Sequence, residues 1–191
     1  MPIFEDYHRT VVGFHGTRRE TARRIVSGET SFRRSTNDDD WLGHGIYFWE
    51  HAPQQAWAWA KQRYARNTQV AVLGAMIRLQ SCFDLLEPAN IETLVKIKQQ
   101  MERDRKALDA PELRQNANAR KFYDCSVFQH AYTVLEEQGE PVDTARAVYV
   151  PTGNAGRLWN RSWISRNAHI QLCVRNPRCI LGAWLVPEKS Q

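Results

Sequence analysis

The sequence lacks the features that mark several classes of protein. No apolar run approaches the roughly 20 residues of a transmembrane helix, and the first residues lack the basic and apolar segments of a secretory signal. None of the four cysteines forms a C-x-x-C pair, and the six histidines show no H-E-x-x-H spacing. We therefore expect no metal ion, no membrane association, and cysteines that pack as small apolar side chains in a reduced, cytoplasmic protein.

What is present is a globular composition with a mildly basic balance. The 191 residues are 42% hydrophobic and 25% charged, which suits a single domain with a substantial core. Lys and Arg number 26 against 21 Asp and Glu, so the formal net charge is +5. A charge of this size permits binding to a polyanion without establishing it.

The order of apolar segments predicts an α+β fold with a mixed sheet. The segments predicted as strands are 10–15, 44–49, 70–79, 145–150, 168–174 and 179–186. Thr17, with Glu20 three residues later, is typical of a capping box that opens a helix ending near Gly28. Pro53 suits the first turn of a second helix, and residues 87–138 predict a helical block. We expect one domain, 1–191, with a helical insertion at about 87–138.

Three short motifs combine residue types that can contact a ligand. Phe-His-Gly-Thr at 14–17 places an imidazole at a strand end, beside a glycine that lets backbone groups approach closely. Gly-His-Gly-Ile-Tyr-Phe at 43–48 offers a tyrosine ring for stacking. His-Ile-Gln-Leu at 169–172 adds a neutral amide on a late strand. Taken alone, a histidine at a strand end or a tyrosine on a strand is more often structural than functional.

In this order the motifs resemble the three-part signature of ADP-ribosyltransferases, in the branch similar to diphtheria toxin and poly(ADP-ribose) polymerases with a His-Tyr-Glu triad. The resemblance covers most of residues 10–80 and 145–186 and leaves the helical block without a counterpart. It implies a mixed, split β-sheet core of ADP-ribosyltransferase type. It also implies NAD⁺ as co-substrate, release of nicotinamide, and His15, Tyr47 and Gln171 as the catalytic residues.

The resemblance further implies how NAD⁺ is held. His15 would bond to the adenosine ribose, backbone groups of Gly16 would hold the nicotinamide amide, and Tyr47 would stack on the nicotinamide ring. The loop 35–41 would cover the donor. The expected NAD⁺-binding residues are His15, Gly16, Thr17, Ser35, Gly45 and Tyr47.

One departure from the family pattern concerns the third triad residue. Gln171 stands where the family usually has Glu, and an amide keeps a hydrogen bond but cannot act as a base near neutral pH. This favours transfer of a single ADP-ribose over chain elongation. A base could come from Glu50 or from an aspartate of 38–40, although an aspartate run is also typical of a turn-forming loop.

A second departure concerns the partner aromatic of the nicotinamide clamp. The position where the polymerase-like branch has this aromatic is Ala58. Trp57 or Trp59 could substitute, although either could equally be a core residue of this Ala-rich helix. We expect at least one of the two to lie in the core.

The loop that precedes Gln171 is predicted to contact the acceptor. Arginines there interleave with tryptophans, at Arg157, Trp159, Arg161, Trp163 and Arg166. Stacking on Trp and phosphate contacts from Arg suit nucleic acid, so RNA or DNA is slightly favoured over protein as the acceptor. The same pattern could be a loop anchored by its tryptophans, or a grip on the NAD⁺ pyrophosphate.

The sequence thus predicts an NAD⁺-dependent mono-ADP-ribosyltransferase that modifies a macromolecule. The alternatives are an NAD⁺ glycohydrolase and a non-catalytic module that binds NAD-like ligands or nucleic acid. Basic residues at 96–106 form either a solvated helix face or a docking surface for nucleic acid or a neutralising partner. The resemblance suggests a bacterial toxin or anti-phage effector held by an antitoxin.

Overall fold

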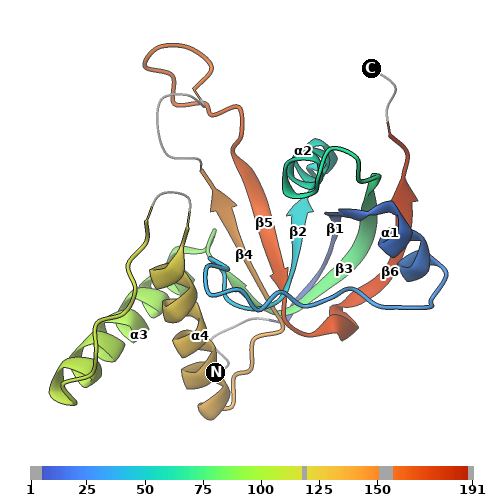
Figure 1. Ribbon diagram of the computed structural model, residues 1–191. Coiled ribbons are helices and arrows are strands. Elements are labelled where there is room, and N and C mark those ends of the chain that lie inside the picture. The colour runs from blue at the N-terminus through green and yellow to red at the C-terminus, as the bar shows by residue number, and fades with distance from the viewer. Residues whose placement is uncertain (1–5, 118–119, 151–156, 189–191) are drawn as a thin grey trace.

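The described part of the chain has an α+β fold. The computed structural model describes residues 6–117, 120–150 and 157–188, so the first part of the predicted 151–167 loop lies outside it. These ranges hold six strands, four α-helices and a short 3₁₀ helix (Figure 1), which confirms the predicted fold class. The elements are β1 (Asp6–Arg18), α1 (Arg19–Val26), β2 (Ile46–Glu50), α2 (Pro53–Arg63), β3 (Val70–Asp84), α3 (Pro88–Ala107), α4 (Phe122–Glu137), β4 (Thr144–Tyr149), β5 (His169–Val174), η2 (Pro177–Cys179) and β6 (Ile180–Val186).

The strands form one mixed sheet that closes on itself. Its order is β1-β2-β5-β4-β3-β6, and an additional β1–β3 pairing joins the first five strands into a ring. β3 and β4 run parallel, whereas the other pairings are antiparallel. β1 pairs with β3 along its length but meets β2 only at Gly13–Glu50 and Phe14–Trp49 in the described chain. Beyond Phe14 the strands β1 and β2 diverge, and we call this divergence the β1–β2 fork.

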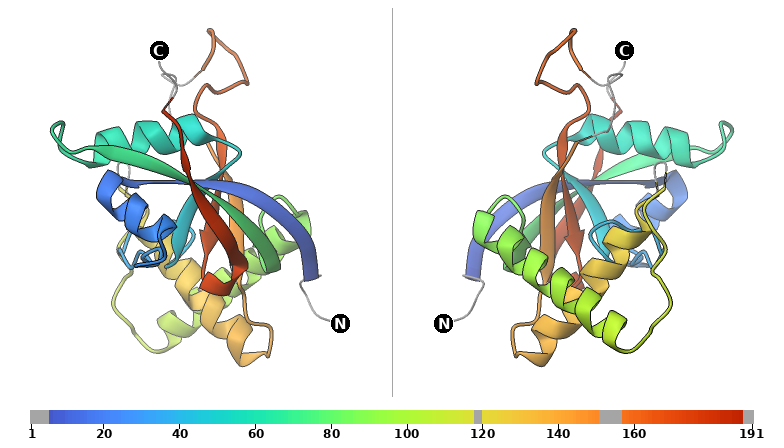
Figure 2. Two further views of the ribbon diagram at one scale, coloured as in Figure 1. Left: turned by 90° about the vertical axis from the view of Figure 1, so that its right-hand side faces the viewer. Right: turned by 90° about the vertical axis from the view of Figure 1, so that its left-hand side faces the viewer.

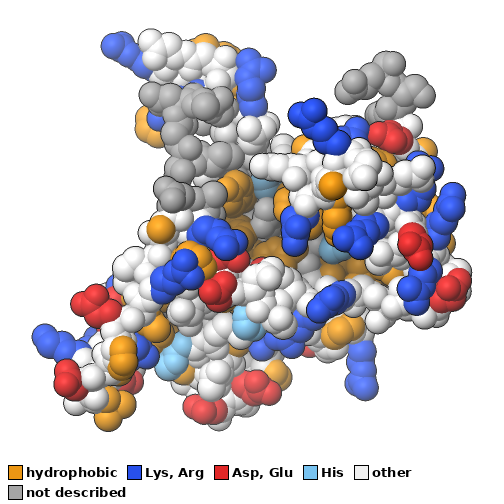
Figure 3. Space-filling model, in the orientation of Figure 1, with side chains coloured by type: hydrophobic (Ala, Val, Ile, Leu, Met, Phe, Trp, Pro, Cys, Tyr) orange, Lys and Arg blue, Asp and Glu red, His pale blue; other side chains and the backbone are white. Residues whose placement is uncertain are grey.

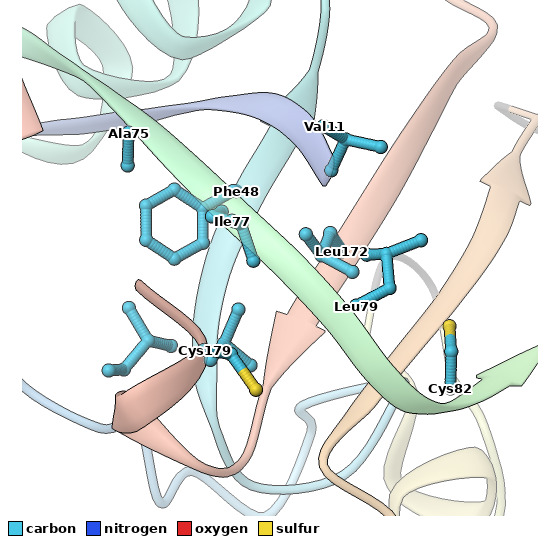
Figure 4. Packing of buried hydrophobic residues seen from close by; sticks show 10 residues of the cluster. Val11, Phe48, Ala75, Ile77, Leu79, Cys82, Leu172 and Cys179 are labelled. Atoms are coloured by element: carbon cyan, nitrogen blue, oxygen red, sulfur yellow. The ribbon is translucent and has the colours of Figure 1, made fainter. Parts of the chain in front are cut away.

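Apolar side chains fill the interior of the ring (Figure 4). Val11, Phe48, Ile77, Leu172 and Cys179 reach it from β1, β2, β3, β5 and η2. On the outside, α1 packs on β3, α2 packs on β1, β2 and β3, and α4 packs on β3, β4 and β5. All four cysteines are free and buried, so the prediction that they pack as apolar side chains is confirmed.

The predicted start of the first helix is wrong. Thr17 and Arg18 still pair with Ala71 and Val70 of β3, so the chain remains extended through Arg18. The helix begins at Arg19, and its N-cap residue makes no side-chain capping hydrogen bond. The capping box from Thr17 to Glu20 therefore does not form. The predicted end is confirmed, because Gly28 follows the helix with φ near 79°.

The helical block 87–138 connects two parallel strands. β3 pairs in parallel with β4 from Cys82–Thr144 to Asp84–Arg146, and parallel neighbours cannot be joined by a tight turn. α3 and α4 pack against each other and supply this connection, at the end of the molecule away from the 157–167 loop (Figure 2). None of the helices in the described ranges is both long and apolar enough to cross a lipid bilayer.

Candidate functional site

The three predicted catalytic residues gather around the β1–β2 fork. Phe14, Trp49 and Gln171 stand in one row across β1, β2 and β5. His15 follows this row by one residue on β1, and Tyr47 precedes it by two residues on β2. The molecule is hollowed in front of these strands, between α2 and the α3–α4 pair, with hydrophobic and histidine side chains inside and Lys and Arg around the rim (Figure 3).

His15 bridges the fork. Its Nδ1 lies 2.8 Å from the backbone oxygen of Tyr47. A carbonyl oxygen only accepts, so Nδ1 carries the proton and Nε2 keeps its lone pair in the neutral ring. The imidazole packs between Phe32 and Phe48, at centroid distances of 5.4 and 5.6 Å. This burial lowers the pKa of His15, with the Tyr47 hydrogen bond opposing it. Nε2 is therefore an acceptor suited to a hydroxyl group.

Tyr47 uses its hydroxyl group inside the protein. The hydroxyl donates to the Gly43 carbonyl at 2.8 Å and accepts the Leu42 N–H at 3.0 Å. Burial raises the pKa of Tyr47 well above its usual range, so the phenol stays protonated. Because its single proton is occupied, the Tyr47 hydroxyl cannot donate to a ligand, and the ring is the part of Tyr47 suited to stacking. Tyr47 shares a strand face with Gln171, since Gln171 lies opposite Trp49 and side chains two apart point the same way.

The glycines of the motifs are explained by close packing within the protein. A Cβ on Gly16 would lie 2.5 Å from the Ala56 carbonyl oxygen of α2, and one on Gly45 would lie 2.3 Å from the sulfur of Cys173. Thr17, which follows Gly16 on β1, is buried. A ligand can therefore meet Gly16 and Gly45 only through their backbone groups. That Gly16 and Gly45 bind NAD⁺ stays a prediction.

The loop 35–45 is closed by its own polar groups. Ser35 and Gly45 exchange two backbone hydrogen bonds, of 2.8 and 3.2 Å. The Asp40 carboxylate accepts the Ser35 hydroxyl and the Asn37 N–H, each at 3.0 Å. Burial raises the pKa of Asp40, and these hydrogen bonds oppose it. The interpretation of the aspartate run as turn-forming is confirmed for Asp40, and the Ser35 hydroxyl is already engaged.

The helical block holds the same loop from outside. Its contacts are the ion pairs Asp38–Arg114 (3.5 Å) and Asp39–Arg120 (3.0 Å), the Tyr132 hydroxyl on the Leu42 carbonyl (2.6 Å), and the Gln129 oxygen on the His44 N–H (2.9 Å). Ion pairs at the surface contribute little to stability. The hydrogen bonds to Leu42 and His44, which are more buried, therefore contribute most to holding the loop. The segment 42–44, directly after the loop 35–41 that is predicted to cover a donor, is therefore held by α4.

Gln171 belongs to a chain of hydrogen bonds that the sequence did not reveal. Its Oε1 accepts the Trp41 indole N–H at 2.6 Å, and its Nε2 lies 3.1 Å from Nε2 of His169. His169 in turn donates from Nδ1 to the Asn167 carbonyl at 2.7 Å. Trp41 joins this chain from a position 130 residues earlier. His169 and Gln171 are two residues apart on one strand, so their side chains point to the same face, and this spacing was the signal in the sequence for their contact.

Aromatic rings surround this hydrogen-bonded chain. Tyr149 stacks on His169 with centroids 5.2 Å apart, and Trp49 lies 6.4 Å from the same ring. Trp59 of α2 is half-exposed and lies 5.5 Å from Trp49. Trp57 is buried in the core, which confirms the expectation for one of these two tryptophans. Trp59 is thus the one placed near the fork.

Replacing Gln171 by glutamate is expected to raise the pKa of His169. In the wild-type protein burial lowers that pKa, so the imidazole is neutral at pH 7. A carboxylate at the amide's position favours the imidazolium and therefore raises the pKa of His169. NMR titration of the His169 ring protons in both proteins measures the shift. An unchanged midpoint in Gln171→Glu would contradict the contact between the two side chains.

Glu50 is occupied by a buried ion pair. Both of its oxygens accept N–H groups of Arg146, at 2.9 and 2.8 Å, and Arg146 also donates to Asp84 at 2.6 Å. All three side chains are almost completely buried. Because Glu50 is almost completely buried and both of its oxygens are bound by a guanidinium, this geometry speaks against Glu50 as the base.

The predicted acceptor residues lie on a projecting loop. Leu158 and Ile164 share a backbone hydrogen bond of 3.1 Å, and the turn between them includes Arg161 with φ near 63°. The loop stands away from the sheet above β4 and β5 (Figures 1 and 2). Trp159 is largely exposed and Trp163 fully exposed, so neither anchors the loop to the protein. The three arginines are also exposed, at 157, 161 and 166.

Comparisons of the sequence with models of protein families and with curated proteins give no match. Across the described ranges, no group of three or more His, Cys, Asp or Glu side chains is arranged to hold a metal ion.

Proposed function

We propose that this chain is an NAD⁺-dependent mono-ADP-ribosyltransferase with a core of ADP-ribosyltransferase type. The observation that carries the proposal is the placement of His15, Tyr47 and Gln171 on three neighbouring strands around one fork. NAD⁺ supplies an activated ribose. The acceptor's electron pair bonds to the anomeric carbon as the C–N bond to nicotinamide breaks, and nicotinamide keeps the electrons of that bond. The acceptor's proton passes to water.

The fork suits an extended dinucleotide. His15 faces Phe48 on one face of the sheet, whereas Tyr47 of β2 and Gln171 of β5 lie on the other face. A ligand that contacts all three must therefore extend across the fork. From His15 onward the edge of β1 toward β2 has no ladder partner among the described strands. Backbone groups there can bond a carboxamide, while the Nε2 lone pair of His15 accepts from a ribose hydroxyl. The Tyr47 ring supplies a stacking surface.

The acceptor we propose is a nucleic acid, RNA or DNA, ahead of protein. Two exposed tryptophans and three exposed arginines lie on the loop that leads into β5, where His169 and Gln171 stand. Bases stack on exposed aromatic rings such as these, while Arg contacts phosphate. The basic balance of the chain has the matching sign.

One assay tests the activity and separates its rivals. Protein would be mixed with NAD⁺ labelled in the adenylate and with a bacterial lysate, and the product divided among RNase, DNase and protease. We expect label that is lost on nuclease treatment only. Label lost to protease alone would move the acceptor to protein. Release of nicotinamide without macromolecular label would identify a glycohydrolase, and binding of NAD⁺ without turnover a non-catalytic module.

Replacing Trp163 by alanine is expected to weaken nucleic-acid binding about fivefold or more, since base stacking contributes about 1–3 kcal/mol per base. Nicotinamide release should stay unchanged, because the fork lies outside the loop. Titration of labelled single-stranded RNA by anisotropy measures the binding. Leu108→Ala, which removes an exposed apolar side chain outside the 157–167 loop, is the matched control. Equal affinity of Trp163→Ala and Leu108→Ala would contradict the acceptor role of the loop.

A cytoplasmic bacterial toxin or anti-phage effector, held by an antitoxin, is the biological setting we propose. Four free thiols suit a reducing compartment. The basic residues of α3 lie on solvent-accessible turns, with Lys98 paired to Glu102 at 2.7 Å, so much of this run is a solvated helix face. Arrest of bacterial growth on expression, relieved by a substitution at His15, would support this setting, and harmless expression of active enzyme would contradict it.

A further inference from the structure

The hydrogen bonds around Gln171 leave only one arrangement of its amide. An indole N–H only donates, so the atom facing Trp41 at 2.6 Å must be the amide oxygen. A carbonyl only accepts, so His169 carries its proton on Nδ1 toward Asn167 and presents a lone pair on Nε2. The Gln171 N–H then donates to that lone pair at 3.1 Å. Donor and acceptor are thus fixed at each step from Trp41 to Asn167.

We infer that Trp41 and His169 are positioning residues that hold the Gln171 amide in one of its two orientations for the substrate. The inference rests on the proposed function, in which Gln171 contacts the ribose of NAD⁺. With one N–H and one oxygen lone pair engaged, the amide keeps one N–H and one lone pair free for a ligand. A free amide can rotate and exchange these two groups, and the two anchors prevent the exchange.

Protonation of His169 removes the hydrogen-bond acceptor that holds the Gln171 amide. The imidazolium carries a proton on both nitrogens, so Nε2 becomes a donor and can no longer accept from Gln171. The amide then has to turn its oxygen toward His169, which points its NH₂ group at the indole N–H of Trp41. Two donors facing each other leave a hydrogen bond unmade. The orientation is therefore stable while His169 is neutral and lost when it is charged.

The surroundings of His169 favour the neutral form. Its ring is half-buried, stacked on Tyr149 of β4 and next to Trp49 of β2. The side chains of Trp41, Trp49 and Tyr149 that contact the pair bring neither a carboxylate nor a cation to it. Burial lowers the pKa of His169, opposed by the bond to Asn167, so the midpoint lies below the usual value and the imidazole is neutral at pH 7.

The orientation can be measured without any activity. The indole ¹H–¹⁵N signal of Trp41 reports its bond to the Gln171 oxygen, and it should shift as the pH falls through the midpoint of His169. In His169→Gln the amide oxygen at position 169 accepts at every pH, so the same signal should stay constant. The inference would be overturned if the Trp41 chemical shift did not change with pH in the wild type. It would also be overturned if that shift changed equally with pH in His169→Gln.

Activity separates positioning from packing. His169→Phe keeps a ring against Tyr149 but removes the acceptor, and should lower kcat by about 10-fold to 10²-fold with little change in KM for NAD⁺. His169→Gln should restore kcat to within a few-fold of wild type at pH 7.5. His130→Gln on α4 is the matched control. Full activity of His169→Phe, or equal loss in both variants, would overturn the positioning role.

Failure of the proposed function gives a different pattern. If the wild-type protein neither releases nicotinamide nor transfers label, the proposed function fails, while the Trp41 titration still decides whether His169 sets the amide. If the wild type transfers and the variants at position 169 behave alike, the proposed function stands and this inference fails.

Discussion

Substituting His15 by asparagine is expected to lower ADP-ribosyl transfer at least about 10²-fold in a protein that still folds. The amide of asparagine occupies the place of Nδ1, so it can donate to the Tyr47 carbonyl that His15 bonds at 2.8 Å. It cannot replace Nε2, the acceptor that we assign to a ribose hydroxyl. Loss of one preorganised hydrogen-bonding group lowers kcat by about 10²-fold to 10³-fold. Labelled transfer and nicotinamide release should fall together.

The same position separates fold from chemistry. His15→Ala removes both nitrogens and the ring that packs against Phe32 and Phe48, so its thermal midpoint should fall below that of His15→Asn. His130→Asn, on α4, should retain both stability and activity. Wild-type transfer by a folded His15→Asn would remove His15 from the site, and the proposed function would lose its first motif.

Replacing Arg146 by methionine is expected to cost about 3–5 kcal/mol of unfolding free energy. The guanidinium forms ion pairs with both Glu50 and Asp84, and its removal leaves two carboxylates buried without a cation. A domain of this size loses about 2–4 °C in Tm for each kcal/mol, so the midpoint should fall by roughly 6–20 °C. Urea unfolding followed by circular dichroism gives the free energy.

A neutralised triple variant provides the control. Combining Arg146→Met with Glu50→Gln and Asp84→Asn removes the stranded charges, and most of the lost stability should return because buried ion pairs are often replaceable by neutral groups. Recovery would assign the loss to uncompensated charge. A single Arg146→Met variant within about 1 kcal/mol of wild type would contradict the burial of the three groups.

Most elements of the fold followed from local patterns. Alternating apolar residues located the strands, and Pro53 and Gly28 marked helix ends because proline suits a first turn and glycine tolerates positive φ. The prediction that α1 starts at Thr17 was wrong, because the pairing of Thr17 with β3 outweighs the local capping signal. No local pattern shows that β1 pairs with both β2 and β3, since ring closure depends on partners distant in sequence.

The candidate site was predictable only in part. The resemblance located His15, Tyr47 and Gln171, and the structure places them around one fork, but their roles remain proposals. Trp41 was missed as a partner of Gln171 because a contact across 130 residues leaves no periodic trace. Arg146 offered a usable signal, a single charged residue in the apolar stretch 145–150, which is costly without a buried partner.

The pairing of β2 with β5 joins segments separated by most of the chain, from Ile46–Val174 to Glu50–Ile170. During synthesis, Tyr47 leaves the ribosome long before Gln171 has been added. The strand that carries Tyr47 then has no β5 beside it, and Trp41 has no amide to bond. The nascent chain therefore lacks the arrangement around Gln171 until β5 has been synthesised, and the segment 41–50 has to wait for its partner strand.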